Sequence, residues 1–283
     1  MPQISARSAR GTHDGHLRIY GHTGGERLVI LIHGYQTPPK KATRAYWRFR
    51  AALRASLPLG AANDVGVLWE FLWAGDHRIP GLSHATYPVR VPVASLTGIT
   101  LAEKFLAKLK PHQGVYLVAH SLGCRVALEA MKWIREHEDS YRGARIEALF
   151  LLAPAVPVEY CERHNDLWFP QPQRGSAEHV LYSRRDLVLA GTFRPGQFVY
   201  GEWGRAVGRA GRPHGRWTSR TDTKLGHGDY WTSRDAVRLI GEQSGKLPRS
   251  LRVHELPDEA IGHRAGIARD VIADRDLPIH SSR

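Results

Sequence analysis

The chain has 283 residues, of which 42% are hydrophobic and 24% are charged, which is enough to build the core of one large domain. Lys and Arg (40) outnumber Asp and Glu (27), so the formal net charge is +13, a value that suggests an anionic partner. Two cysteines exclude a disulfide framework and a cysteine-based zinc site. Because the chain shows no apolar N-terminal stretch and no apolar run near the roughly 20 residues of a membrane helix, we expect a soluble, cytoplasmic protein.

Short apolar runs alternate along the chain with helical patterns, which is typical of an α/β fold with a mostly parallel sheet and helices on both faces. The predicted strands lie at 17–21 (an antiparallel edge strand), 28–33, 65–73, 115–120, 146–152 and 179–183, with a weaker one at 217–221. Helices are predicted at 41–56, 93–110, 122–137 and 230–242. Residues 194–220, rich in Gly and Arg, are expected to form a loop or insertion.

Ser121 stands where a buried strand meets a helix, in the sequence VYLVAHSLGCRVALEA at 115–130. The small residues two positions before and after it, Ala119 and Gly123, are typical of a nucleophile elbow, in which a strained turn lifts the serine Oγ clear of the sheet. We expect large side chains at these two positions to clash with one another. A helix that begins at Leu122 directs its free N–H groups and positive dipole toward the place where an oxyanion would form. The pattern predicts that Ser121 is a nucleophile.

A second buried strand, LVILI at 28–32, ends in His33-Gly34-Tyr35 about 90 residues before the elbow. With these two motifs the chain resembles the α/β hydrolase superfamily over residues 17–243, and is similar to an uncharacterised branch that carries HGY and AHS(L/M)G motifs. The resemblance implies an α/β-hydrolase domain at 1–244, followed by an extension at 245–283 that is a docked helix or partly disordered. It also implies an oxyanion hole formed by the backbone N–H groups of Leu122 and of Tyr35 (or Gln36), with His33 shaping the loop.

A nucleophilic serine needs a histidine base and a carboxylate that orients it. The superfamily resemblance implies the chain order Ser, Asp, His. Asp186 follows the predicted strand at 179–183, where the superfamily usually places the acid, whereas the strand at 146–152 is followed by no carboxylate before Glu159. His227 lies between Gly226 and Gly228 ahead of the last predicted helix, at the position of the superfamily's catalytic histidine.

Other roles for the acid and the base stay open at this point. Asp186 could be a surface charge neutralised by Arg184 and Arg185, and His214 is the alternative base. We expect His120 to be structural, because strand geometry would direct its side chain to the face opposite that of Ser121. No histidine pair with a nearby carboxylate indicates a catalytic metal.

Together these residues predict a serine hydrolase that cleaves an ester-type acyl bond through an acyl-enzyme, without metal or cofactor. An acyltransferase or thioesterase on the same residues is an alternative, because only the acceptor or leaving group differs. A second alternative is a non-catalytic, hydrolase-like protein that binds an anionic partner.

The positive charge is concentrated in two segments. Residues 1–60 carry 10 basic and 2 acidic residues, and residues 184–220 carry 8 and 2. In an α/β hydrolase these segments would hold the oxyanion loop and the stretch between the acid and the base. We therefore expect a small-molecule acyl substrate, with an anionic substrate or a membrane surface favoured over nucleic acid.

Overall fold

The structure is a computed structural model that describes residues 1–8, 10–57, 66–76, 87–163, 165–167, 176–191, 193 and 204–245. The predicted C-terminal extension lies, from residue 246 onward, outside the described residues. The same is true of residues 194–203 in the predicted insertion.

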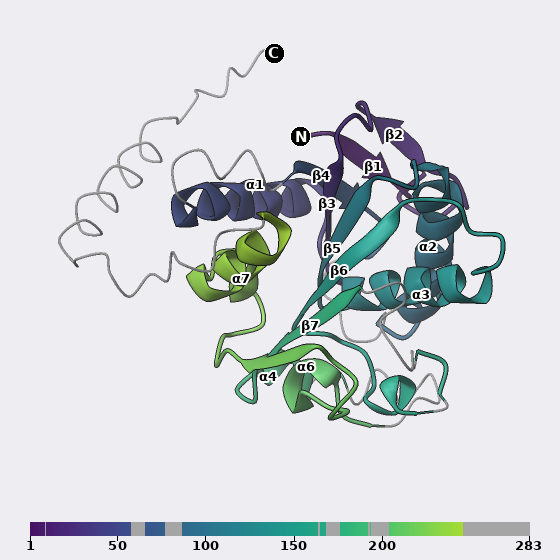
Figure 1. Cartoon of the computed structure of the whole chain (residues 1–283). Helices are drawn as coiled ribbons and strands as arrows, with labels where there is room; N and C mark the ends of the chain where they lie inside the picture. Colours follow the sequence, from purple (N-terminus) through teal and green to yellow (C-terminus); the bar gives the residue numbers. More distant parts are fainter. Residues whose placement is uncertain are drawn as a thin grey trace, which may run out of the picture. The chain divides into compact units, whose positions relative to one another are not determined.

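One sheet forms the centre of the described chain, with the strand order β2-β1-β4-β3-β5-β6-β7-β8. Neighbouring strands are parallel except at the edge, where β2 pairs with β1 in the antiparallel direction (Figure 1). All seven residues of β5 are buried, as expected for a central strand covered on both faces. The strands are β1 (Gln3–Ser5), β2 (Arg18–Tyr20), β3 (Arg27–Ile32), β4 (Val67–Leu72), β5 (Gly114–His120), β6 (Arg145–Leu152), β7 (Ala177–Tyr182) and β8 (Ser219–Asp222).

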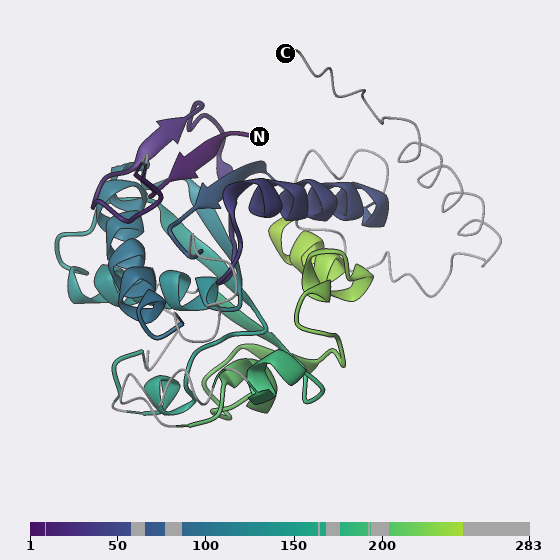
Figure 2. The ribbon, with the colours of Figure 1, turned by 180° about the vertical axis from the view of Figure 1, so that it is seen from behind.

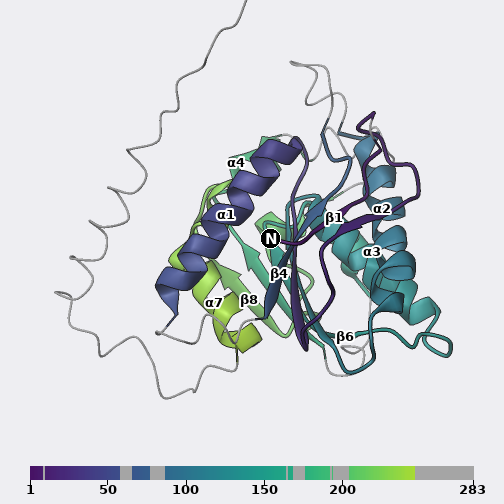
Figure 3. The ribbon, with the colours of Figure 1, turned by 90° about the horizontal axis from the view of Figure 1, so that it is seen from above.

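Helices cover the sheet in two layers. On one face α1 (Pro39–Ser56) packs against α7 (Arg234–Gly245), and on the other α2 (Arg90–Lys104) packs against α3 (Gly123–Glu136) (Figures 2 and 3). The shorter elements are α4 (Leu187–Gly191), α6 (Val207–Ala210) and the 3₁₀ helices η2 (Leu106–Lys108), η3 (Glu159–Cys161) and η5 (Asp229–Trp231). This arrangement confirms the predicted fold class.

Most predicted elements are present within a few residues, and the differences have local causes. Strand β1 was not predicted, because three residues are too few to show an alternating pattern. The helix predicted at 93–110 ends at Lys104, since Phe105 leaves the helical region at φ −125°. The last helix begins at Arg234 rather than at residue 230, because η5 forms a separate turn before it.

Helices α2 and α3, which cover the same face of the sheet, approach each other closely at Gly98. A Cβ atom on this residue would lie 2.4 Å from Val126 O and 2.7 Å from Glu129 Cβ. Backbone atoms cannot move aside as a flexible side chain can, so the contact requires glycine in the middle of α2.

We expect Gly98→Ala to lower the free energy of unfolding by about 1–3 kcal/mol, because overpacking outweighs the gain in helix propensity. Gly191→Ala is the matched control: Gly191 is also helical, but nothing lies within 4 Å of its added Cβ. Urea unfolding of both variants measures the difference. Equal stability of the two would contradict this account of the α2–α3 contact.

Candidate active site

Ser121 occupies a tight turn between β5 and α3 with a φ of 54°, a value that non-glycine residues adopt only when their surroundings hold them there. Its N–H donates to Leu152 O at 2.9 Å, and its carbonyl accepts from Cys124 N–H at 3.0 Å and Ala155 N–H at 3.2 Å. These bonds fix the turn, and only 6% of Ser121 is exposed.

Two glycines allow the segments around Ser121 to come together. A Cβ on Gly123 would lie 2.4 Å from His33 O and 2.8 Å from Ile32 O, and a Cβ on Gly34 would lie 2.7 Å from Ser121 Cβ. The sequence predicts that a large side chain at 123 would crowd residue 119. The nearest obstacles to a side chain at 123 are the carbonyl groups at the end of β3.

His227 lies between the other two predicted site residues. Its Nε2 is 2.9 Å from Ser121 Oγ, and its Nδ1 is 2.7 Å from Asp186 Oδ2. With the proton on Nδ1, His227 donates to the carboxylate and accepts from the serine hydroxyl. The other oxygen of Asp186, which is fully buried, accepts from Leu189 N–H at 2.9 Å in the first turn of α4. The three side chains come from loops that follow β5, β7 and β8.

The alternative residues lie elsewhere. Arg184 Nε is 3.5 Å from Asp222 Oδ2, so the buried Asp186 is not a surface charge neutralised by this arginine. His214 is exposed, with its Nε2 3.4 Å from Arg220 Nη1. Glu159 is exposed on η3. Neither His214 nor Glu159 takes part in the hydrogen bonds around Ser121.

The predicted oxyanion donors flank Ser121 on its two sides. Leu122 is the N-cap residue of α3, and no partner for its N–H occurs among the described residues. Tyr35 follows Gly34, whose backbone lies against Ser121. Gln36, the alternative to Tyr35, already donates its N–H to Gly75 O at 3.0 Å. Of the two, the loop therefore favours Tyr35.

His33 holds the oxyanion loop through Trp73, at the end of β4. Trp73 donates its backbone N–H to His33 Nε2 at 3.2 Å and its indole N–H to His33 O at 2.7 Å, and the two rings stack with centroids 5.7 Å apart. His33 Nδ1–H donates to Gly34 O at 2.9 Å. Burial lowers the pKa of His33 to about 4, so the imidazole is neutral at physiological pH. Sequence reasoning expected His33 to shape the loop but gave no role to Trp73.

Arg7, which follows β1, supports the same loop from outside. It donates to Trp73 O at 3.0 Å and forms an ion pair with Asp76, next to the Gly75 carbonyl that accepts from Gln36. Nothing in the local sequence around Arg7 indicated this role, because its partners lie more than 60 residues away.

His120 holds the backbone of His227 in place. Its Nε2–H donates to His227 O at 2.6 Å, and the two ring centroids are 4.9 Å apart. Burial, with a smaller contribution from the nearby His227, lowers the pKa of His120 to about 3. This contact with a backbone carbonyl agrees with the structural role expected for His120, and the expected direction of its side chain stays a prediction. His120 is a positioning residue for the loop that carries His227.

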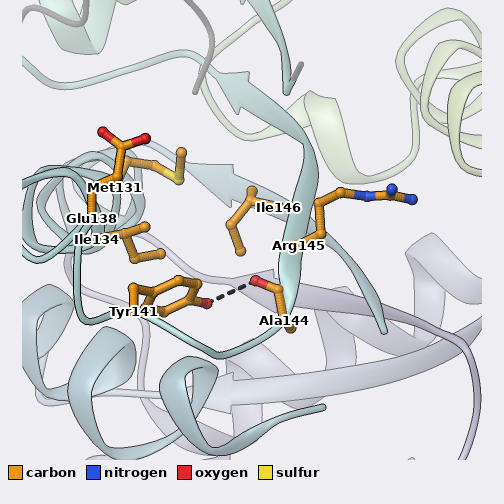
Figure 4. Close-up of a pocket in the computed structure, with 7 residues that line it drawn as sticks. All are labelled: Met131, Ile134, Glu138, Tyr141, Ala144, Arg145 and Ile146. Carbon is orange, nitrogen blue, oxygen red and sulfur yellow. Dashed lines mark hydrogen bonds between the residues drawn. The ribbon is translucent and has the colours of Figure 1, made fainter. Parts of the chain in front are cut away.

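The described residues contain no group of three or more His, Cys, Asp or Glu arranged to hold a metal ion, and no helix that is long and apolar enough to cross a membrane. A cavity of about 20 Å³ lies between α3 and β6, lined by Ile134, Tyr141 and Ile146 among others, with Tyr141 Oη donating to Ala144 O at 2.8 Å (Figure 4). It lies at the start of β6, whereas Ser121 follows the end of β5, and it has room for about one water molecule.

Comparisons with known proteins give one clear result. The model of the alpha/beta hydrolase family matches residues 29–279. A search of curated proteins gives no significant match.

Among solved structures, a presumed hydrolase of Agrobacterium vitis S4 is 13% identical, with a TM-score of 0.41 over 77% of this chain and 86% of that chain. A presumed cell surface hydrolase of Lactobacillus plantarum WCFS1 is 12% identical, with a TM-score of 0.40 over 85% and 97%. A thermostable esterase of Pseudomonas putida ECU1011 is 14% identical, with a TM-score of 0.35 over 85% and 78%.

The low pKa values of His33 and His120 predict how stability depends on pH. An unfolded histidine binds a proton below a pH of about 6.5, whereas these two stay neutral in the folded chain down to pKa values of about 4 and 3. The unfolded state therefore binds more protons between these limits, and the free energy of unfolding falls as the pH falls from 6.5 toward 4.

The variant His120→Gln tests this assignment, because glutamine keeps an N–H donor but does not titrate. Between pH 8 and pH 5 we expect wild type to lose roughly 2 kcal/mol more stability than the variant. Urea unfolding at the two pH values gives the comparison. An unchanged pH dependence in the variant would show that His120 is not buried in its neutral form.

Proposed function

Because this chain belongs to the alpha/beta hydrolase family, we propose that it is a serine hydrolase that cleaves an ester-type acyl bond. Ser121, His227 and Asp186 act as nucleophile, base and orienting acid. The observation that carries the proposal is the unbroken hydrogen-bond chain from Ser121 Oγ to His227 Nε2 (2.9 Å) and from His227 Nδ1 to Asp186 Oδ2 (2.7 Å). Both distances suit proton transfer from the serine and orientation of the imidazole.

In the proposed reaction, His227 Nε2 takes the Ser121 proton as Oγ attacks the acyl carbon of the substrate. The proton then passes to the leaving alkoxide, which departs as an alcohol and leaves an acyl-enzyme. His227 Nε2 then takes a proton from water as the water oxygen attacks the acyl carbon. The bond from that carbon to Ser121 Oγ breaks, the proton passes from Nε2 to Oγ, and the acid is released with the serine restored. Asp186 stays ionised and stabilises the imidazolium through Nδ1–H, and its own orientation is supported by Leu189 N–H.

The backbone N–H groups of Tyr35 and Leu122 donate to the tetrahedral oxyanion in this mechanism. Two observations support Leu122: it caps the N-terminus of α3, and its N–H has no partner among the described residues. Tyr35 is supported by the contact between Gly34 and Ser121, which brings the loop after β3 to the nucleophile. Donors held by the backbone are already in place when the negative charge develops, so no reorganisation is needed.

Water is the acyl acceptor that we propose, and a small-molecule ester is the substrate. We assign this activity to residues 1–244. The finer similarity to a branch with HGY and AHS(L/M)G motifs stays a prediction, as does the cytoplasmic location.

Replacement of Ser121 by Ala tests the nucleophile. We expect loss of labelling by a fluorophosphonate probe and a fall in kcat of at least about 10⁴-fold on p-nitrophenyl esters of graded chain length, because the variant cannot form the acyl-enzyme. Ser140→Ala, which changes an exposed serine in the loop after α3, is the control and should label like wild type. Labelling that persists in Ser121→Ala would exclude Ser121 as the nucleophile.

The proposed acid is tested by Asp186→Asn. We expect kcat to fall roughly 10³–10⁴-fold with little change in KM, because asparagine cannot stabilise the imidazolium and favours the wrong histidine tautomer. Asp222→Asn changes a nearby carboxylate that pairs with Arg184 and should leave kcat within a few-fold of wild type. A similar loss in both variants would argue against a specific role for Asp186.

A further inference from the structure

Helix α1 carries an unusual concentration of positive charge. Its 18 residues include Lys40, Lys41, Arg44, Arg48, Arg50 and Arg54 and no Asp or Glu. In the described part of the chain, no ion pair involves any of these six side chains. The charge of the helix is therefore not neutralised within the described protein.

The basic residues of α1 are segregated from its apolar ones. Ala42, Tyr46, Phe49 and Leu53 are buried and form the face that packs on the body of the protein. Successive residues of a helix turn by about 100°, which places the exposed residues on the opposite side. This exposed stripe consists of Lys40, Lys41, Arg44, Trp47, Arg48, Ala51, Arg54 and Ala55.

Trp47 lies within the exposed stripe, and 53% of its surface is exposed. The guanidinium carbon of Arg50 lies 5.6 Å from the centroid of its ring. Tryptophan rings favour the boundary between lipid headgroups and acyl chains, where the indole is partly apolar and its N–H finds a polar partner. An exposed indole between cationic side chains fits such a boundary better than it fits water.

The neighbouring helix on the same face of the sheet gives an internal comparison. On α7, Arg238 lies 3.6 Å from Asp235 and 3.7 Å from Glu242, so its charge is balanced on the same helix. Helices α1 and α7 lie side by side (Figure 3), and of the two it is α1 whose cations have no acidic residue on the same helix.

An open hollow borders the C-terminal half of α1. Its volume is about 340 Å³, and it is lined by Arg50, Leu53 and Arg54 of α1 together with Met1 and Pro2, among others. Two guanidinium groups beside a hollow of this kind suit a phosphodiester, because arginine binds phosphate oxygens with two parallel N–H groups.

We propose that the exposed stripe of α1 binds the surface of a membrane rich in anionic phospholipid, with the Lys and Arg side chains at the headgroup phosphates and Trp47 in the interface. Duplex nucleic acid would match the charge but would leave the indole without an apolar environment.

Helix α1 directly follows the loop that carries Tyr35, so docking of α1 would bring the candidate active site close to the lipid surface. Only this consequence rests on the proposed function.

Sedimentation of the full-length protein with vesicles tests the proposal. We expect binding to an equal mixture of phosphatidylglycerol and phosphatidylcholine, loss of that binding at high salt, and no binding to phosphatidylcholine alone. The triple variant K41E/R44E/R48E should bind the mixed vesicles roughly a hundredfold more weakly, and Trp47→Ala several-fold more weakly. Because these side chains are exposed, circular dichroism should show both variants folded.

A charge-matched control separates the stripe from the net charge of the protein. K108E/K110E/R142E changes the charge by the same amount at exposed positions after α2 and α3, on the opposite face of the sheet, and should bind like wild type. Ser121→Ala should also bind like wild type, so failure of the proposed hydrolase activity and failure of the membrane proposal are distinguishable. Equal loss in the two triple variants would overturn the proposal, as would binding of duplex DNA through α1 without binding of vesicles.

Discussion

The close approach of the start of α3 to the end of β3 is the contact on which the candidate active site depends. Gly123 meets the carbonyl oxygens of His33 and Ile32, and Gly34 meets the Cβ of Ser121. A methyl group at either glycine would push the two segments apart. Their contact holds Ser121 in its left-handed conformation and brings the loop that carries Tyr35 to the N-terminal end of α3, where a partial positive charge from the helix favours an anion.

Two buried histidines support this centre. His33 is held between Trp73 and the Gly34 carbonyl and so fixes the loop after β3, while His120 donates to the backbone of His227 and fixes the loop that carries it. Burial keeps both imidazoles neutral, which suits the work of a hydrogen-bond donor and acceptor better than that of a charged group. The proposed base is thus oriented by two kinds of contact: a carboxylate at its ring and a histidine at its carbonyl.

The net charge of +13 has an uneven structural basis. Several arginines are balanced inside the fold, as Arg7 is by Asp76 and Arg216 is by Glu178. Helix α1 differs because its cations share one exposed face with an indole and have no acidic residue on the same helix. Of the 10 basic residues among residues 1–60, six lie on α1.

The sequence by itself determined the fold class, the central strands and the nucleophile elbow, because these depend on patterns of neighbouring residues: apolar runs on β3 and β5, and small residues around Ser121. It also pointed to Asp186 and His227 by their order along the chain, but their distances to one another came only from the structure. The contacts of Arg7, Trp73 and His120 could not be predicted, since each depends on a partner at least 40 residues away in the chain. A local pattern specifies an element and its buried face; only the folded chain decides which backbone groups meet across the sheet.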